Sequence, residues 1–411
     1  MNTKLRNDAD RIVETAIRSV LPDEAVKRAL EKTDFPGRLI LVSVGKAGWQ
    51  MAKAAYELLG DRIERGIVLT KYGHVKGALG DILCLEGGHP VPDENSVKNT
   101  EEAIRTVSGL RDDDTVLLLL SGGGSALFEK PLVPLSELQE ITSQLLGSGA
   151  SITEINTIRK RLSAVKGGRF AQLCAPASVY CVVLSDIVGD PLDMIASGPA
   201  FPDSSTCAEA QAIIEKYKIR LSAGAEKLMQ TETPKTAEKV TTCITGNVTQ
   251  LCAAAADSCK ALGYEPIILT DTLRCEAAQA GRFLSSIAVT HHKDGVKRAY
   301  IAGGETVVHL RGRGLGGRNQ ELALSAAEEI RGIKNAAVFS VGSDGTDGPT
   351  DAAGGYVDGD TLDALAEQGT DYAAALDNND SYHALRSVGG LLVTGPTGTN
   401  VNDVSVVLIE E

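Results

Sequence analysis

A run of three glycines flanked by serines follows an apolar segment, residues 115–120, and has the sequence Ser121-Gly122-Gly123-Gly124-Ser125. Glycine permits positive φ angles and close backbone approach, so successive peptide N–H groups can converge on an anion, and the serine hydroxyls add donors. The segment therefore predicts a phosphate or carboxylate site. An ordinary tight turn between a strand and a helix is the alternative interpretation.

Lys46 lies between Gly45 and Gly48, where a predicted strand at residues 38–44 gives way to a predicted helix that ends near Leu59. The macrodipole disfavours a cation at the N-terminus of a helix, so a lysine there usually has an anion nearby. The spacing of a P-loop is missing. Lys46 is a candidate phosphate ligand, and a lysine that extends into solvent is the alternative.

Two acids, Asp186 and Asp190, follow an apolar strand predicted at residues 178–184. Open α/β sheets bind ligands at the carboxyl ends of their strands. Either carboxylate could accept a proton from an alcohol or hold a metal ion. Local turn or helix-capping chemistry explains such residues equally well.

A basic helix face is predicted after Ser151, which begins a capping-box signature with Glu154. Asn156 and Lys160 are four residues apart, so they share one face of this helix. Such a face would supply local positive charge for an anionic ligand, although a solvated basic face is the plain alternative.

The second half of the chain contains another glycine-rich stretch, which leads into a predicted helix that begins with Arg318, Asn319 and Gln320. It superficially suggests a dinucleotide fingerprint, but two arginines lie inside the loop and no suitable ribose-binding acid is evident about 20 residues later. Arg318 and Gln320 are therefore interpreted as a phosphate or nucleotide clamp. Upstream, Glu305 follows two glycines at the end of a further predicted strand.

Three carboxylates lie in one glycine-rich loop after the predicted strand at residues 336–341, namely those of Asp344, Asp347 and Asp351. Mg²⁺ binds one or two carboxylates and completes its shell with water and phosphate oxygens. Asp344 is therefore a candidate near a metal ion, with turn chemistry as the alternative.

The composition excludes several classes of protein. A formal net charge of −13 argues against nucleic acid or an anionic membrane as the main partner. The eight cysteines include no C-x-x-C pair, which favours reduced thiols in a cytoplasmic protein over a redox or zinc site. No apolar stretch approaches the length of a membrane span.

The chain of 411 residues is long enough for two or three domains. Strands alternate with glycine turns and helices in the first half, which predicts a largely parallel, Rossmann-like sheet. A Thr-, Glu- and Lys-rich segment with Pro234 indicates a linker. We therefore expect two α/β domains, an N-terminal one at residues 1–237 and a smaller, mixed one at residues 238–411.

Many loop motifs occur in an order that resembles the glycerate 2-kinase family of the MOFRL type, whose members have also been labelled hydroxypyruvate reductases. The motifs are VGKA at 44–47, GGHPVPD at 87–93, LSGGGSAL at 120–127, INTIRK at 155–160, LSDIVGD at 184–190, ASGP at 196–199, GGRNQE at 316–321, GSDGTDGPTDAAG at 342–354 and TGPTGTNVND at 394–403.

The resemblance implies ATP- and Mg²⁺-dependent phosphorylation of D-glycerate at its 2-hydroxyl. The family's active-site lysine falls on Lys46, and its active-site aspartate falls in the segment from Asp186 to Asp190, where both acids stay candidates. Under this hypothesis the glycine turn, Ser125 and Arg318 hold anionic oxygens, while Asp344 and Glu305 are candidates for Mg²⁺.

Two other functions stay open at this point. An NAD(P)H-dependent hydroxypyruvate reductase would fit the family's other label, but it lacks a convincing G-x-G-x-x-G unit. A non-catalytic sensor of a phosphorylated metabolite would bind the same anion without turnover. The sequence does not fix the oligomeric state, and a homodimer stays open.

Overall fold

The computed structural model describes residues 1–411, which form two compact units. The first sheet unit contains Pro22–Ser185 and Asp190–Thr245. The second sheet unit contains Met1–Leu21, Asp186–Gly189 and Gly246–Glu411. The chain therefore passes between the units several times.

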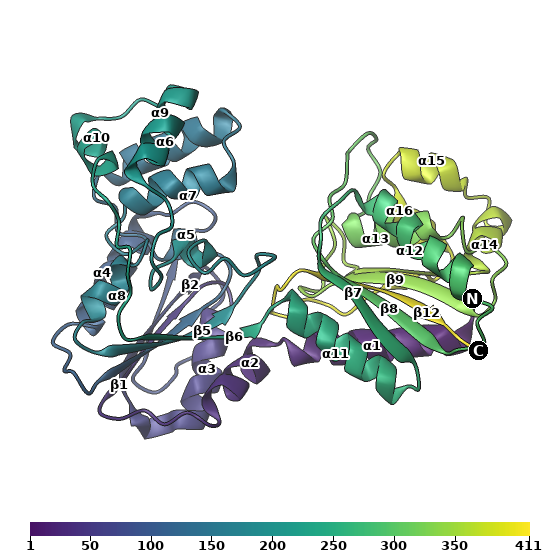
Figure 1. Ribbon diagram of the computed structural model, residues 1–411, viewed down its shortest axis with the longest axis horizontal. Helices are drawn as coiled ribbons and strands as arrows, with labels where there is room; N and C mark the ends of the chain where they lie inside the picture. The colour runs from purple at the N-terminus through teal and green to yellow at the C-terminus, as the bar shows by residue number, and fades with distance from the viewer. The chain divides into compact units, whose positions relative to one another are not determined.

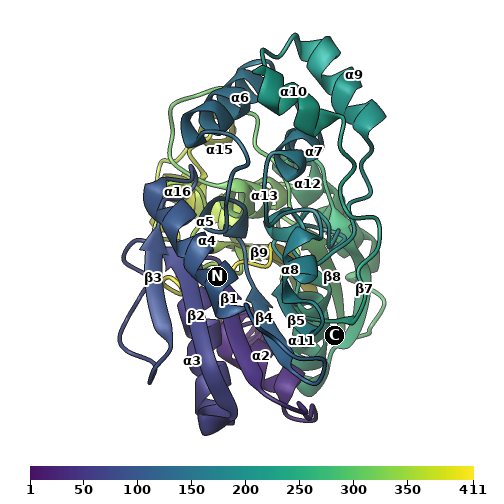
Figure 2. The same ribbon diagram turned by 90° about the vertical axis from the view of Figure 1, so that its left-hand side faces the viewer.

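The first sheet unit is built on six strands in the order β3-β2-β1-β4-β5-β6. The neighbouring pairs from β3 to β5 are parallel, and these strands lie side by side in Figure 2. This is the strand order of a Rossmann-like sheet, whose switch point lies between β1 and β4. The strands are β1 Leu39–Val44, β2 Ile63–Lys71, β3 Leu83–Gly87, β4 Thr115–Leu120, β5 Ser178–Leu184 and β6 Val240–Gly246.

Helices cover both faces of this sheet (Figure 1). One apolar cluster joins α2 and α3 to alternate residues of the strands, such as Leu39 and Leu41. Helix α4 packs against β2 and β3, and α8 packs against β5. A separate apolar cluster joins α6, α7, α9 and α10. The helices are α2 Pro22–Leu30, α3 Gly48–Leu59, α4 Glu94–Thr106, α5 Gly124–Leu127, α6 Leu135–Gly147, α7 Ile152–Arg161, α8 Arg169–Cys174, α9 Cys207–Tyr217 and α10 Ala223–Met229, with 3-10 turns η1 Gly60–Arg62 and η2 Ile195–Ser197.

The second sheet unit has a mixed sheet in the order β11-β10-β9-β12-β8-β7. Only β7 and β8 pair in parallel; the other neighbours are antiparallel. The last strand of the chain, β12, lies between β8 and β9. The strands are β7 Glu265–Leu273, β8 Arg298–Gly304, β9 Ala336–Gly342, β10 Gly354–Asp358, β11 Leu391–Leu392 and β12 Asp403–Ile409.

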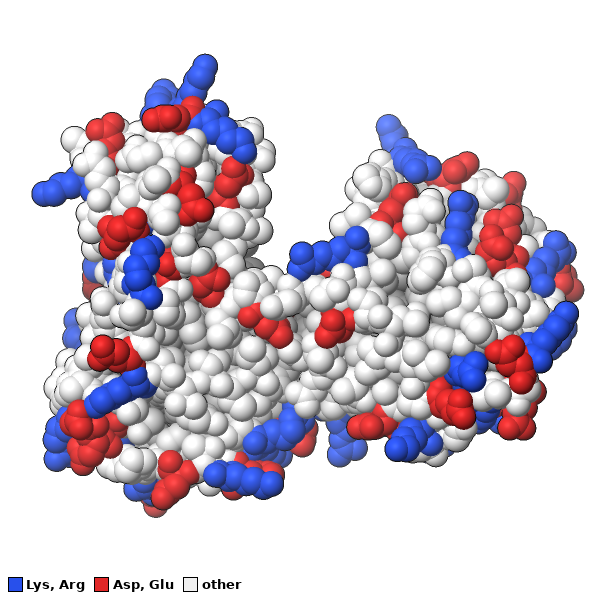
Figure 3. All heavy atoms as spheres, viewed as in Figure 1, with Lys and Arg blue, Asp and Glu red and all other residues white.

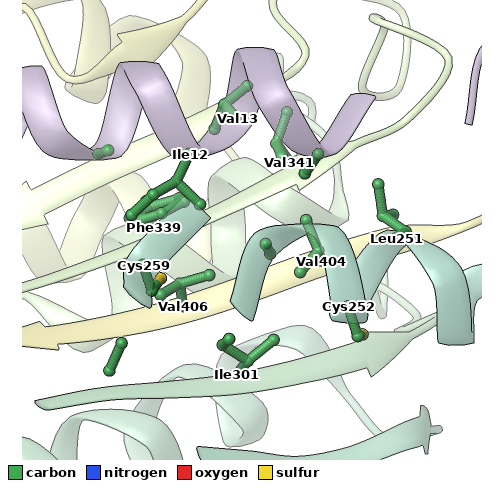
Figure 4. Packing of buried hydrophobic residues seen from close by; sticks show 14 of the residues in the cluster. Ile12, Val13, Leu251, Cys252, Cys259, Ile301, Phe339, Val341, Val404 and Val406 are labelled. Carbon is green, nitrogen blue, oxygen red and sulfur yellow. The ribbon is translucent and has the colours of Figure 1, made fainter. Parts of the chain in front are cut away.

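The helix that opens the chain packs in this second unit. Its apolar residues, such as Ile12 and Val13, meet Phe339, Val404 and other residues of β9, β12 and α11 (Figure 4). Full burial of one such side chain contributes about 1.5–3 kcal/mol, so the helix is firmly held. The helices of the unit are α1 Thr3–Ser19, α11 Val248–Ala261, α12 Ala277–His291, α13 Arg318–Ala326, α14 Thr361–Glu367, α15 Tyr372–Asp377 and α16 Ser381–Ser387.

The structure confirms the expected fold class: two α/β parts, a parallel Rossmann-like sheet in the N-terminal region and a mixed sheet in the C-terminal region. The compact units differ from residues 1–237 and 238–411 in three segments, 1–21, 186–189 and 238–245. The division at residue 237 therefore stays a prediction about domains.

Charged side chains of both signs are interspersed on the face drawn in Figure 3. None of the helices combines the length and the apolar character that crossing a membrane requires.

Candidate active site

The loops after β1 and β4 meet at the switch point of the first sheet. Val44 lies opposite Leu120 in the parallel register, so both strands end at the same level. The N–H of Lys46 donates to the carbonyl of Gly122 at 2.9 Å, and that of Ser121 donates to the carbonyl of Val44 at 2.9 Å. The structure thus brings together the lysine and the glycine turn that the sequence singled out separately.

Close backbone approach at this junction requires glycine at position 45. Its φ is +122°, and a Cβ there would lie 2.2 Å from the Ser121 hydroxyl and 2.5 Å from the Ser121 carbonyl oxygen. The Ser121 hydroxyl accepts from the N–H of Ala47 at 3.1 Å and lies 3.3 Å from the carbonyl of Val44, to which it donates. Ser121 therefore joins the two loops, and its hydroxyl is engaged within the chain.

The glycine turn is packed between two basic side chains. Gly123 has a φ of +84°, and a Cβ there would lie 3.0 Å from Nε2 of His89 and 3.0 Å from Cγ of Lys46. The side chain of Lys46 is partly exposed and forms no ion pair or hydrogen bond within the chain. The turn therefore leaves the ammonium group of Lys46 available to a ligand.

Ser125 and Asn156 are connected through Ser197, a residue that the sequence analysis did not single out. The hydroxyls of Ser125 and Ser197 are 2.8 Å apart, and Ser197 donates to Oδ1 of Asn156 at 3.1 Å. Ser197 and its neighbour Ala196 have φ angles of 60° and 50°. Such left-handed non-glycine residues cost about 1–3 kcal/mol each and are common where a site is held in a fixed shape.

Lys160 is almost fully buried, and its charge is compensated. Its Nζ lies 3.0 Å from Asp193 and 3.1 Å from Asp203. Both acids lie in the long loop after β5, so Lys160 holds that loop to α7. Its part in binding a ligand stays a prediction.

Two more cations lie buried beneath the glycine turn. Nζ of Lys166 donates to the carbonyls of Ser125 and Phe128 at 2.8 and 2.7 Å, and Arg159 donates to Ser125 at 2.9 Å. Glu129 lies 3.3 Å from Lys166 and 3.7 Å from Arg159. Burial lowers the pKa of Lys166 to about 8, although Glu129 opposes the shift. The cluster fixes the end of α5 through its carbonyl groups.

The two candidate aspartates belong to different compact units. Asp190 lies in the first sheet unit with a φ of +49°, which is strained for an aspartate. Asp186 lies in the second, where Nδ2 of Asn402 donates to its carbonyl at 3.1 Å. Which of them meets the hydroxyl of a substrate stays open.

In the second sheet unit, Arg318 is joined to a buried carboxylate. Its Nε and Nη2 donate to the two oxygens of Asp403 at 2.5 and 2.9 Å, and its Nη1 lies 3.5 Å from Glu305. Burial raises the pKa of Asp403, whereas Arg318 opposes the shift. The positive charge of Arg318 is thus balanced within the chain.

Glu305 and Asp344, the two candidate metal ligands, lie on the loops after β8 and β9. These strands flank β12, where Asp403 is opposite Gly304 on one side and Gly342 on the other. Nδ2 of Asn402 lies 3.4 Å from Glu305, and Asp344 accepts from the N–H of Thr346 at 3.0 Å.

The donor chemistry at this sheet edge fits Mg²⁺, which uses one or two carboxylates and keeps water or phosphate oxygens as its other ligands. No group of three or more His, Cys, Asp and Glu side chains is arranged to hold a metal ion. A metal here would therefore depend on ligands outside the protein.

The N-terminus of α13, expected to bind phosphate, already holds a carboxylate of the chain. Asp347 accepts from the N–H groups of Asn319 and Gln320 at 3.2 and 2.8 Å. Burial raises the pKa of Asp347 to about 6, despite these hydrogen bonds. The fully buried Gln320 donates to Thr350 at 2.9 Å. A ligand role for Gln320 stays a prediction.

Comparisons with known proteins show the family of the chain. Residues 8–230 match a family described as a domain of unknown function, DUF4147, and residues 298–403 match the MOFRL family. The chain is 54% identical to a D-glycerate 2-kinase of Thermotoga maritima over 98% of both chains. It is 40% identical to a putative hydroxypyruvate reductase of Agrobacterium vitis, over 97% of this chain and 93% of that protein.

A solved structure has the same fold throughout. The crystal structure of a glycerate kinase from Thermotoga maritima is 53% identical, covers 99% of both chains and superposes with a TM-score of 0.96. Because the similarity extends over the whole length and the family's motifs occur in the same order along the chain, the chain belongs to the glycerate 2-kinase family of the MOFRL type.

Proposed function

We propose that this protein is an ATP-dependent kinase that phosphorylates D-glycerate at its 2-hydroxyl and releases 2-phosphoglycerate and ADP. The observation that carries the proposal is Lys46, an uncompensated cation held against a glycine turn at the switch point of a Rossmann-like sheet. The names of its full-length relatives support the same reaction.

The transfer requires one bond to form and one to break. The 2-hydroxyl oxygen attacks the γ-phosphorus of ATP, and the bond from that phosphorus to the bridging oxygen breaks as ADP leaves. The hydroxyl proton passes to a carboxylate, for which Asp190 and Asp186 are the candidates.

Charge neutralisation supplies most of the catalysis in such a transfer. Lys46 neutralises the transferring phosphoryl group, and the N–H groups of the glycine turn orient its oxygens. Glu305 and Asp344 would hold Mg²⁺, which supplies charge neutralisation to the nucleotide phosphates when bound. Arg318, which is joined to Asp403, keeps Glu305 in place through its ion pair with that side chain.

A cytoplasmic location and a homodimer are further proposals. All eight cysteines are free thiols, as expected in a reducing compartment. The oligomeric state can be measured by light scattering at assay concentrations.

The test is an assay with D-glycerate, ATP and Mg²⁺ in which the product passes to enolase without phosphoglycerate mutase. Immediate enolase turnover is the expected result, because enolase accepts the 2-phosphate. ATP consumption without enolase turnover would refute the regiochemistry. Ligand binding without ATP consumption would favour a non-catalytic sensor.

The reductase alternative draws on the name of the Agrobacterium vitis relative. It is tested in parallel by following NAD(P)H oxidation with hydroxypyruvate. We expect no oxidation, because the G-x-G-x-x-G match at Gly312 to Gly317 does not directly follow a strand: β8 ends at Gly304. Oxidation without kinase turnover would reverse the assignment.

A further inference from the structure

Four basic side chains gather at the carboxyl ends of β1, β2 and β3: Lys46, Lys71, His74 and His89, which we call the basic cluster. Val44, at the end of β1, lies opposite Leu69 of β2, and Lys71, at the end of β2, lies opposite Gly87 of β3. Lys46 and His89 each follow the end of their strand by two residues. Parallel strands thus bring these residues to one edge of the sheet.

The basic cluster has no acidic partner. None of its four members forms an ion pair, although the protein carries a formal net charge of −13. Of the nearby acids, Glu86 accepts from the N–H of Val75 at 2.8 Å and interacts with His74 without forming an ion pair, and Asp93 accepts from the hydroxyl of Tyr72 at 2.6 Å. This positive charge is therefore available to an anion from solution.

The members of the basic cluster differ in what they can offer a ligand. Nδ1 of His74 lies 2.8 Å from the carbonyl of Lys46 and donates to it, so His74 positions the loop after β1. His89 lies against Gly123 in the glycine turn. Burial, followed by the charges of Lys46, Lys71 and His74, lowers the pKa of His89, so its imidazole is neutral at neutral pH and still donates a hydrogen bond. Lys46, Lys71 and His89 are the members left to contact a ligand.

On the other side of the glycine turn, Lys160, Arg159 and Lys166 are each already paired with an acid of the chain. Lys160 pairs with Asp193 and Asp203, while Arg159 and Lys166 share Glu129. Ser125 and Ser197 present hydroxyls there. An anionic group of the substrate beside the glycine turn is thus best accommodated on the side of Lys71 and His89.

We propose that Lys71 and His89 form a carboxylate subsite, next to Lys46, that binds the carboxylate of the 2-hydroxy acid. This inference rests on the proposed function. In a 2-hydroxy acid the reacting oxygen is bonded to the carbon that bears the carboxylate. If Lys46 holds the phosphoryl group, the carboxylate must therefore bind beside it, where Lys71 supplies a point charge and His89 an N–H donor.

The kinetic test uses Lys71→Met and His89→Ala. Removing one hydrogen bond to a charged group costs enough to lower kcat/KM for D-glycerate by about 10- to 100-fold, mainly through KM. The KM for ATP should stay unchanged. A rise in the KM for ATP instead would mean that these residues hold a nucleotide phosphate, which would overturn the carboxylate assignment.

A neutral analogue isolates the role of the charge. D-glyceramide has the same hydroxyls as D-glycerate but no carboxylate, so the wild-type protein should strongly prefer D-glycerate. Lys71→Met should lose most of this preference, and Lys71→Arg should keep most of it. An unchanged preference in Lys71→Met would overturn the proposal.

Direct binding separates this inference from the proposed function. Calorimetric titration with D-glycerate alone should give a dissociation constant about tenfold higher or more for Lys71→Met than for the wild type, whether or not turnover occurs. Lys98→Met removes an exposed lysine of α4, 68% of whose side chain is accessible, and should bind like the wild type. Equal binding by Lys71→Met and Lys98→Met, with both proteins folded by circular dichroism, would refute the subsite even if the kinase assay succeeds.

Discussion

The two sheet edges differ in whether their cations are paired with acids. At the first sheet, Lys46, Lys71 and His89 form no ion pair, and Lys46 and His89 lie against the glycine turn. At the second, Arg318 is joined to Asp403 and Glu305. Positive charge without an acidic partner destabilises the site when no ligand is bound and favours binding of an anion. Charge that is paired within the chain instead holds loops in place. This difference is what we expect if, as proposed, the first edge binds the transferring group and the second supports a metal.

The strongest way to break this comparison is Lys46→Ala. Loss of a preorganised cation beside the transferring group should lower kcat by about 10²- to 10³-fold, while the fold stays intact because Lys46 has no partner in the chain. Steady-state kinetics and circular dichroism measure both effects. Lys53→Ala, on the exposed surface of α3, is the control and should keep full activity. An unchanged rate for Lys46→Ala would remove the lysine from the mechanism.

Gly45→Ala tests whether the junction of the loops after β1 and β4 depends on close backbone approach. A Cβ 2.2 Å from the Ser121 hydroxyl, at a φ of +122°, should cost more than about 3 kcal/mol of unfolding free energy. Gly149→Ala is the matched control, because this glycine caps the end of α6 with a φ of +73° and nothing lies within 4 Å of the added Cβ. Its cost should be about 1 kcal/mol by urea denaturation. Equal costs would contradict the steric argument.

At the second sheet edge, Arg318→Ala should act on stability. The substitution leaves the buried carboxylate of Asp403 without its partner, which should cost about 3 kcal/mol. Urea denaturation of Arg318→Ala and of the double variant Arg318→Ala/Asp403→Asn measures the effect. The second substitution should restore part of the loss. A stable single variant would mean that the pair is not a structural support.

The smallest expected effect concerns pH and Asp347. Its pKa in the folded protein, about 6, exceeds the ordinary value of 3.8, so the folded state binds more protons than the unfolded state between these values. The contribution of Asp347 to stability is therefore present below pH 4 and is lost as the pH rises through 6. Relative to Asp347→Asn, the wild type should lose about 2 kcal/mol between pH 4 and pH 7. If the unfolding free energies of the wild type and of Asp347→Asn changed equally with pH, the shifted pKa would be contradicted.

Local signals were enough to predict much of the fold. The strands at Thr115–Leu120 and Ser178–Leu184 have the predicted bounds, because they are continuous apolar runs bounded by polar or glycine-rich segments. The capping box of Ser151 and Glu154 is present. The helix that it begins ends at Arg161.

Other elements are fixed by contacts that are distant in sequence. Strand β10 was not predicted because it begins with Gly354 and Gly355, which disfavour strands locally; here a Cβ on Gly354 would lie 1.9 Å from the carbonyl oxygen of Ser340. Strand β6 was predicted as a strand, but the sequence does not say which sheet it joins.

The residues of the candidate site also divide into those with a local sequence signal and those placed by contacts distant in sequence. Lys46 and the glycine turn could be found from their local pattern, since each follows an apolar strand. The engagement of Lys160 could not, because Asp193 and Asp203 lie 33 and 43 residues away in the chain. His89 was visible only as part of a motif; its basic neighbours come from separate strands.

The central place of β12 has a consequence for the order of events during synthesis. Helix α1 leaves the ribosome first, yet the cluster that buries its apolar residues includes Val404, Val406 and Leu408, which leave last. The six strands of the first sheet are complete by residue 246. That sheet can form while translation continues, whereas the apolar cluster around α1 stays incomplete until β12 is made, although α11 can cover part of α1 once residue 261 is made.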